Sequence, residues 1–315
     1  MRIRYYFLLS LFLIIWNQCR EVIDPDIESI PDDNFLKALI DQGVDTSGDS
    51  IISPIEAELI TYLDISSKNI TDMKGIEMFI NLHTLDCSDN LINTMDFTMN
   101  PDLAWLDCSD NQLVHLNISN NMDLWRLYCN NNFLLNLDIS NNVNLEWVFC
   151  EWNQLTVLDV SQNINLEELA IDGNNLTSLD LSKNTALEVL WCGCNQLVTL
   201  DVTNNTALKV LCCYQNLLSS LDVSENIGLT GLCCQTNQLT KLDVTNNSIL
   251  NGLQCGNNNL TSLDISSNSA LGYIDISGIP SLNMVCVWET PFPPAGVEVD
   301  KTGSPNVYFT SDCSK

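Results

Sequence analysis

The sequence predicts a solenoid in which short parallel strands stack on two faces. A 21-residue unit repeats nine times without insertion between Leu85 and Tyr273. Within each half of a unit, apolar residues alternate with polar ones, as they do on a strand. Each half ends in asparagine, which tolerates left-handed backbone and bonds to turn amides. A short fixed period means that each unit contacts only its neighbours.

Each unit is two near-copies of one half. The halves of one unit read Leu187-x-x-Leu190-x-Cys192-x-x-Asn195 and Leu197-x-x-Leu200-x-Val202-x-x-Asn205. We therefore expect two strands per turn, on opposite faces. Two rows of asparagine, Asn90 to Asn258 and Asn100 to Asn268, should form internal ladders at the corners.

The N-terminal residues 1–18 are predicted to be a signal peptide. Arg2 and Arg4 precede an apolar run, residues 5–16, which is shorter than a membrane span. Residues 19–30 follow as an acidic tether. Cys19 resembles the lipidated cysteine of bacterial lipoproteins; the alternative is that it leaves with the signal. The sequence therefore predicts an exported protein, either secreted or an outer-surface lipoprotein.

Residues 31–62 are predicted to form a helical N-terminal cap that resembles a calcium-binding EF-hand. Helix-type spacing follows Pro31, and a second helix is expected from Pro54 to about Tyr62. Between the helices, oxygen ligands stand at EF-hand positions, and Ser50 replaces the usual glycine. The resemblance implies that calcium would be held by Asp45, Ser47, Asp49, the carbonyl of Ile51, Ser53 and Glu56. The alternative is a helix capping box formed by Ser53 and Glu56.

The regular units lie between two divergent segments. Residues 63–84 are a first repeat of about 22 residues, and residues 85–273 are the nine regular ones. From residue 274 the pattern degrades, and prolines and glycine predict an irregular C-terminal cap over 274–315. We expect a disulfide between Cys286 and Cys313, because this exported segment has little core.

One repeat position is nearly always cysteine. Ile171 and Ile276 take that position in two units, so it is an apolar core position, where free cysteine behaves as a small hydrophobe. Strands in register keep neighbouring Cβ atoms about 4.8 Å apart, more than the usual ~3.8 Å of a disulfide. The sequence therefore predicts a buried ladder of free thiols: Cys87, Cys108, Cys129, Cys150, Cys192, Cys213, Cys234 and Cys255.

The regular units resemble leucine-rich repeats. Leu187, Leu190, Cys192, Asn195 and Leu197 match the consensus L-x-x-L-x-L-x-x-N-x-L, with cysteine where leucine is usual. The first repeat, with its Gly75-Ile-Glu-Met-Phe79, resembles those of bacterial internalins. The resemblance covers about two-thirds of the chain. It implies a parallel sheet with a ligand-binding face, since members of this family are mostly binding proteins.

Outward positions of the cysteine-bearing strand are predicted to form the binding surface. Aromatic side chains gather there in units two to seven, and an exposed aromatic patch is typical of an interaction surface. The alternative is that these large side chains only shield the sheet. The predicted ligand-binding residues are Trp105, Tyr128, Trp147, Phe149, Trp191 and Tyr214. On the other face, an aspartate row should be stabilised by hydrogen bonds to turn amides and to the serine or threonine two residues on.

Charge and motifs limit the classes of function that the sequence predicts. The chain has 40 acidic residues against 12 Lys and Arg, which makes nucleic acid an improbable partner because phosphate binding needs a basic surface. His83 and His115, the two histidines, have no catalytic motif around them. We therefore expect a non-enzymatic protein that binds a protein or a glycan, with no cofactor besides calcium and with membrane contact only through Cys19. The alternatives are a calcium-stiffened structural spacer and a carbohydrate-binding or hydrolase-associated module.

Overall fold

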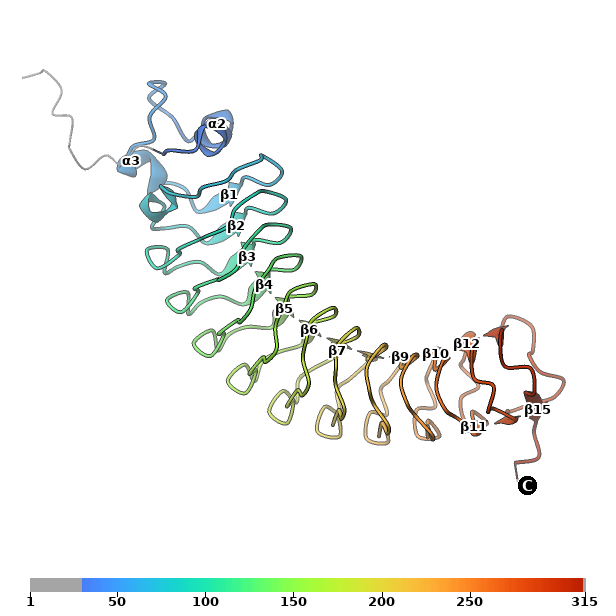
Figure 1. Ribbon diagram of the computed structural model, residues 1–315. Coiled ribbons are helices and arrows are strands. Elements are labelled where there is room, and N and C mark those ends of the chain that lie inside the picture. The colour runs from blue at the N-terminus through green and yellow to red at the C-terminus, as the bar shows by residue number, and fades with distance from the viewer. Residues whose placement is uncertain (1–29, 314–315) are drawn as a thin grey trace, which may run out of the picture.

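The computed structural model describes residues 30–313, which form a curved solenoid behind a small helical cap (Figure 1). The cap contains α2 (Asp33–Asp41) and α3 (Pro54–Ala57), and a 3-10 turn, η1 (Ile76–Met78), lies in the first repeat. The helix α3 is shorter than predicted: Ile60 follows it as partly buried coil packed on the core. The predictions for residues 1–29, including the signal peptide, most of the tether and Cys19, lie outside the described residues.

Within residues 30–313, one parallel sheet of twelve three-residue strands runs the length of the solenoid. The strands, in order across the sheet, are β1 (Tyr62–Asp64), β2 (Thr84–Asp86), β3 (Trp105–Asp107), β4 (Arg126–Tyr128), β5 (Trp147–Phe149), β6 (Glu168–Ala170), β7 (Val189–Trp191), β8 (Val210–Cys212), β9 (Gly231–Cys233), β10 (Gly252–Gln254), β12 (Tyr273–Asp275) and β14 (Glu298–Asp300). Neighbours pair in register, so that Leu106 lies beside Leu127. Figure 1 shows this sheet along the inner, concave side of the arc.

The outer face differs from the prediction of a strand in every turn. A second sheet exists only near the C-terminal end of the described chain, from β11 (Ser262–Asp264), β13 (Met284–Cys286) and β15 (Tyr308–Thr310). Isolated bridges join Asp96 to Asn117 and Asp243 to Asp264. Strand pairing needs a spacing of about 4.8 Å. Because the outer side of an arc has the larger radius, its turns are spread too far apart for a continuous ladder.

Two asparagine rows hold the corners, as predicted. Asn153 of the first row donates from Nδ2 to the carbonyl of Cys129 at 3.0 Å, and its Oδ1 accepts from the Leu134 N–H at 2.9 Å. Asn142 of the second row donates to the carbonyls of Ile118 and Asn121, at 3.0 and 2.8 Å. These bonds join each turn to the one before it, which satisfies buried backbone groups that have no ladder partner.

The eight cysteines of the predicted ladder are buried and free. Each lies just after its strand, among the leucines of the same turn and of its neighbours. The thiol of Cys87 donates to the carbonyl of Asp107 at 3.3 Å, so the polar hydrogen has a partner. Burial raises the pKa of Cys213 and Cys255 to about 12, which keeps these thiols protonated.

The segment after Tyr273, predicted to be irregular, instead continues the coil. Ile274, Ile276, Ile279 and Leu282 are buried, so the apolar alternation persists where the motif fades. Strand β12 pairs with β14 and β13 pairs with β15, in register. The prediction was wrong because stacking depends on which positions are apolar. The prolines lie in turns and loops between the strands and do not interrupt it. No helix within residues 30–313 is long and apolar enough to cross a membrane.

Candidate binding surface on the concave sheet

Outward side chains of neighbouring strands stand in columns along the concave face, because the strands are in register. The column after the central residue contains Tyr128, Phe149, Ala170, Trp191 and Cys212. The column before the central residue contains Trp105, Arg126 and Trp147. All six predicted aromatic residues are half-buried, so each presents part of its ring to solvent, and all except Tyr214 stand in these two columns.

Five of the six predicted residues form a continuous aromatic row. Ring centroids lie 5.6 Å apart for Trp105 and Tyr128, and 4.9 Å apart for Tyr128 and Phe149, whose planes are stacked. Phe149 also contacts Trp147 and Trp191, at 6.4 and 6.1 Å. These separations are typical of favourable aromatic pairs. We name this set, Trp105, Tyr128, Trp147, Phe149 and Trp191, the aromatic row.

The contact between Phe149 and Trp191 spans two repeats because the residue between them is small. Ala170 occupies the same column on the intervening strand and is fully buried. The two rings can therefore approach each other above its methyl group. A larger side chain at this position would separate the row into two parts.

Arg126 lies within the row, between two tryptophans. Its guanidinium carbon is 3.5 Å from the centre of the Trp147 ring and 4.1 Å from that of Trp125. Such cation–π contacts hold the guanidinium against the sheet. The sequence prediction missed Trp125, which stands one residue outside the strand; the alternation rule gave no reason to place its ring beside Arg126.

Tyr214, the sixth predicted residue, lies apart from the row. Its hydroxyl donates to Asp172 Oδ2 at 3.2 Å. Its ring covers Gly193, where an added Cβ would be 2.4 Å from the ring. Trp152, which was not predicted, covers Gly173 in the same way. Both glycines leave room for a flat ring, a signal that can be read only once the stacking is known.

Several carboxylates on the two faces of the solenoid have pKa shifts in opposite directions. On the concave face, desolvation raises the pKa of Asp107, Glu151 and Asp172. On the outer face, hydrogen bonds from the serine or threonine two residues on lower the pKa of the aspartates, as at Asp138 and Asp201. Asp107 accepts from the N–H and hydroxyl of Ser109, and Asp172 accepts from the hydroxyl of Tyr214, so of these three carboxylates Glu151 is the one with an unpartnered oxygen, Oε2.

The predicted calcium loop is closed by its own hydrogen bonds. Glu56 Oε1 accepts from the N–H groups of Thr46 and Ser47, each at 2.9 Å. Glu56 Oε2 accepts from the N–H and hydroxyl of Ser53, which is the predicted capping box of α3. Together these bonds, led by the Ser53 N–H, lower the pKa of Glu56 to about 2.

The remaining calcium ligands also face the loop backbone. Asp45 Oδ1 accepts from the Gly48 N–H at 2.7 Å, and Asp49 Oδ1 accepts from the Ile51 N–H at 2.9 Å. Ser50, at the position usually held by glycine, takes a φ of 63°. The donor set therefore fits a calcium loop in composition, but Glu56 would have to leave the capping box to reach an ion. Calcium binding stays a prediction.

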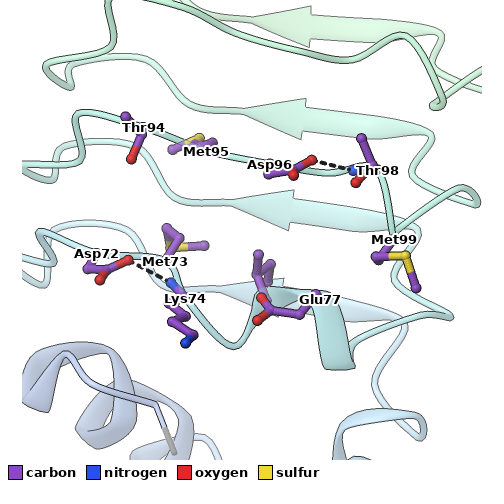
Figure 2. Close-up of a pocket in the computed structure, with 10 residues that line it drawn as sticks. Asp72, Met73, Lys74, Glu77, Thr94, Met95, Asp96, Thr98 and Met99 are labelled. Atoms are coloured by element: carbon purple, nitrogen blue, oxygen red, sulfur yellow. Dashed lines mark hydrogen bonds between the residues drawn. The ribbon is translucent and has the colours of Figure 1, made fainter. Parts of the chain in front are cut away.

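A pocket of about 450 Å³ lies between η1 and the first regular repeat, away from the aromatic row (Figure 2). Figure 2 shows Asp72 and Glu77 of the first repeat opposite Thr94, Met95 and Asp96 of the next one. Asp72 accepts from the Lys74 N–H at 2.8 Å, and Asp96 accepts from the Thr98 N–H at 2.9 Å. The acidic groups are thus bonded to their own turns.

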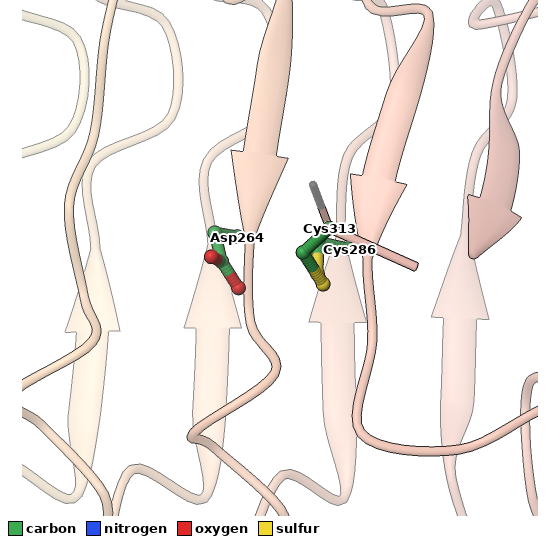
Figure 3. Close-up of side chains that lie close together, drawn as sticks. All are labelled: Asp264, Cys286 and Cys313. Carbon is green, nitrogen blue, oxygen red and sulfur yellow. A yellow bond between two sulfur atoms is a disulfide. The ribbon is translucent and has the colours of Figure 1, made fainter. Parts of the chain in front are cut away.

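Cys286 and Cys313, the predicted pair, form a disulfide in the C-terminal region, with Cα atoms 5.6 Å apart. Asp264 lies beside them (Figure 3). Within residues 30–313 this trio is the one close group of three metal-ligand side chains. It offers no thiolate, because both sulfurs are bonded to each other, and it is therefore a covalent link rather than a metal site.

The fold and its cysteine ladder match a solved structure. The functional domain of InlJ from Listeria monocytogenes, described as including a cysteine ladder, has a TM-score of 0.81 and 34% sequence identity to this chain. This chain has the leucine-rich-repeat fold. The match covers 88% of it and 61% of the InlJ chain.

Further structures share the leucine-rich-repeat fold. The internalin InlF from Listeria monocytogenes has a TM-score of 0.60 at 18% identity, over 86% of this chain and 95% of that one. A chain from the octameric complex of Latrophilin 3, Unc5D and the leucine-rich repeat of FLRT2 has a TM-score of 0.61 at 20% identity, over 77% and 83%. No protein-family model and no curated protein matches the chain. The solved structures that share this fold thus include internalin-type proteins.

Proposed function

We propose that this leucine-rich-repeat protein is a non-enzymatic binding protein that holds a protein partner on its concave sheet. The main support for this proposal is the aromatic row. Five half-exposed rings touch in sequence across β3 to β7, and Arg126 stacks between Trp125 and Trp147. Monomeric proteins rarely leave such a surface open, and aromatic residues and arginine dominate protein interfaces.

The proposed mechanism of binding depends on the rigidity of the concave sheet. Strands in register, two asparagine rows and ring-to-ring contacts fix the side chains before the partner arrives. A pre-formed surface loses little conformational entropy on binding, so more of the contact energy appears as affinity. Support of a general kind comes from FLRT2, whose leucine-rich repeat forms part of a complex with other proteins.

The test is to truncate the centre of the row. Trp147→Ala and Trp191→Ala should weaken partner capture by at least about 30-fold, since central aromatic truncations commonly cost about 2 kcal/mol or more. The melting temperature should barely change, because both side chains point away from the core. Capture would be measured by cross-linking the exported domain to candidate partner cells and identifying the cross-linked proteins.

The matched control is Asp201→Ala on the outer face, which should leave capture unchanged. A protein that is captured by the wild type and by this control, but not by the tryptophan variants, would support the concave site. Normal capture by the tryptophan variants would contradict it. Specific binding on a glycan array that depends on Trp147 would replace the protein partner with a carbohydrate.

We also propose that the protein is exported and attached to the cell surface through Cys19. The motive is the charged and apolar N-terminal sequence that ends at this cysteine. Metabolic labelling with a radioactive fatty acid should mark the wild type and not Cys19→Ala. An unlabelled wild-type protein recovered from the medium would indicate that Cys19 leaves with the signal.

A further inference from the structure

We propose that the partner on the concave sheet is a basic protein segment, whose lysine or arginine side chains pair with Glu151 and Asp172 beside the aromatic row. This inference rests on the proposed function and adds the chemistry of the partner. The charge of the concave face, the partners that its ionic groups already have, and the contrast with the outer face support it.

The concave face carries a large excess of negative charge. Counted over strands β2 to β10, with one residue before and two after each strand, it holds eight carboxylates and two cations. The carboxylates are Asp86, Asp107, Glu146, Glu151, Glu167, Glu168, Asp172 and Glu188. A cationic partner would therefore be attracted to this face over long range and oriented on it.

Both cations of the face already have partners within the protein. The guanidinium of Arg126 lies between the rings of Trp125 and Trp147. Lys209 forms an ion pair with Glu188 on the neighbouring turn, with Nζ and Oε2 2.5 Å apart. Neither cation forms an ion pair with Glu151 or Asp172, so the charge of these two groups is left for a ligand.

Glu151 and Asp172 lie two residues after the ends of β5 and β6, on neighbouring turns, and Glu151 follows Phe149 of the aromatic row by two residues. The Oε2 atom of Glu151 is buried and has no hydrogen-bond partner. Asp172 accepts from the Gly193 N–H and from the Tyr214 hydroxyl. A buried carboxylate oxygen without a donor is costly, and an ammonium or guanidinium group provides the strongest donor available to it.

The outer face shows what satisfied carboxylates look like in the same protein. Asp138 and Asp201 each accept from both the backbone N–H and the hydroxyl of the residue two positions on. A cation gains less from such a carboxylate, because it competes with bonds already made. Asp86 and Asp107 of the concave face are bonded in the same way, through Ser88 and Ser109. The concave face therefore differs through the unpartnered Oε2 of Glu151, two residues after Phe149 of the aromatic row.

The experiment uses a fluorescent 12-residue peptide of alternating lysine and serine, an equal peptide with glutamate, and a neutral chito-oligosaccharide. Affinity would be measured by fluorescence anisotropy, with competition for the oligosaccharide, at about 0.15 M salt, where long-range attraction is screened. The wild-type domain should bind the lysine peptide and neither of the other two ligands.

Charge-neutral variants locate the binding. Glu151→Gln with Asp172→Asn should lower the affinity for the lysine peptide roughly tenfold or more. The matched control, Asp159→Asn with Asp180→Asn, removes the same charge from the outer face of the same two repeats and should change the affinity less than about twofold. Thermal melts of both variants establish that each is folded.

Three results separate this inference from the proposed function. Equal weakening by both pairs would mean attraction to the acidic chain as a whole and would overturn the inference. Loss of peptide binding in Trp147→Ala but not in the concave charge pair would also overturn it, while leaving the aromatic site in place. Binding of the oligosaccharide in preference to the lysine peptide would show that the ligand is a neutral glycan.

Discussion

At the scale of single residues, the turn after each concave strand requires a left-handed backbone that side chains rarely adopt. Nine residues of the repeats and their flanks show it with φ between 50° and 58°, among them Asp110, Asn131, Trp152 and Cys194. The same position in the fifth unit is Gly173, with a φ of 68°. Since the other units tolerate a side chain there, backbone strain alone does not explain this glycine. The Trp152 ring that covers it does.

Gly173→Ala should therefore destabilise the protein mainly by displacing Trp152. The new Cβ would lie 2.4 Å from the ring, and left-handed backbone adds about 1–2 kcal/mol for a residue with a Cβ. The expected signs are a lower melting temperature and a tryptophan emission shifted to longer wavelength. In a Trp152→Ala background, Gly173→Ala should cost clearly less; an equal cost in both backgrounds would mean that the backbone is the whole effect.

At the scale of elements, the loop before α3 can serve either as a cap or as an ion-binding loop. Its carboxylates accept hydrogen bonds from the loop backbone and from the N-terminus of α3. A calcium ion would replace these donors with one divalent cation. The hydrogen bonds of the loop stabilise the N-terminal cap, and calcium is an additional stabiliser to be tested.

We expect calcium to raise the melting temperature of the wild-type domain, because the loop supplies oxygen ligands at EF-hand spacing. Asp45→Ala, which removes the first ligand, should abolish this response, whereas Asp201→Ala should keep it. Differential scanning calorimetry with and without 1 mM-scale calcium, roughly the range of extracellular modules, measures the effect. A wild type that does not respond would leave Glu56 with the capping role alone.

Acid should destabilise the same element. The pKa of Glu56 is lowered from its ordinary 4.5 to about 2, so its bonds contribute fully above pH 4.5 and are lost as the pH falls toward 2. Glu56→Gln should lower stability at pH 6 and make it less sensitive to acid. Glu151→Gln should instead raise the stability at pH 6. Desolvation raises the pKa of Glu151, so its charge is unfavourable in the fold and its removal is favourable. Urea unfolding at pH 6 and pH 3 distinguishes the two.

At the scale of the whole molecule, stability comes from stacking, and the cysteine ladder is part of it. The ladder cysteines are buried between leucines, whereas Cys194 and Cys233 are partly exposed on the concave side. A single unit buries too few side chains to offset the entropy of ordering its backbone. The array therefore unfolds through its ends or as a whole.

This arrangement predicts two classes of thiol. Under native conditions a maleimide reagent should label Cys194 and Cys233 quickly and the eight ladder cysteines slowly. The buried thiols react slowly through lack of access and raised pKa, and buried Cys212 should behave like them. All eleven free cysteines of residues 30–313 should react after denaturation. Peptide mass spectrometry identifies the labelled positions. Rapid labelling of central ladder positions such as Cys150 would show that the turns open in the native state.

The repeat, the buried leucines and cysteines, the asparagine rows and the outward placement of the aromatic residues could be predicted from the sequence. Each of these depends on period-two alternation and on stacking in register. Both can be recognised locally, and the repeat shows the same pattern in every unit. The residues that form the aromatic row could be predicted for the same reason. The aspartate row of the outer face, bonded to the serine or threonine two residues on, was local as well.

How the two faces differ and which rings touch depends on the way the turns stack in space. Curvature removes the outer ladder from the regular units, because the radius is larger there. Ring contacts cross repeats, so Phe149 reaches Trp191 above Ala170, Arg126 lies between Trp125 and Trp147, and Tyr214 covers Gly193. No repeat contains this information alone, since it depends on side chains that stacking brings together from residues about 20 or 40 positions apart in the chain.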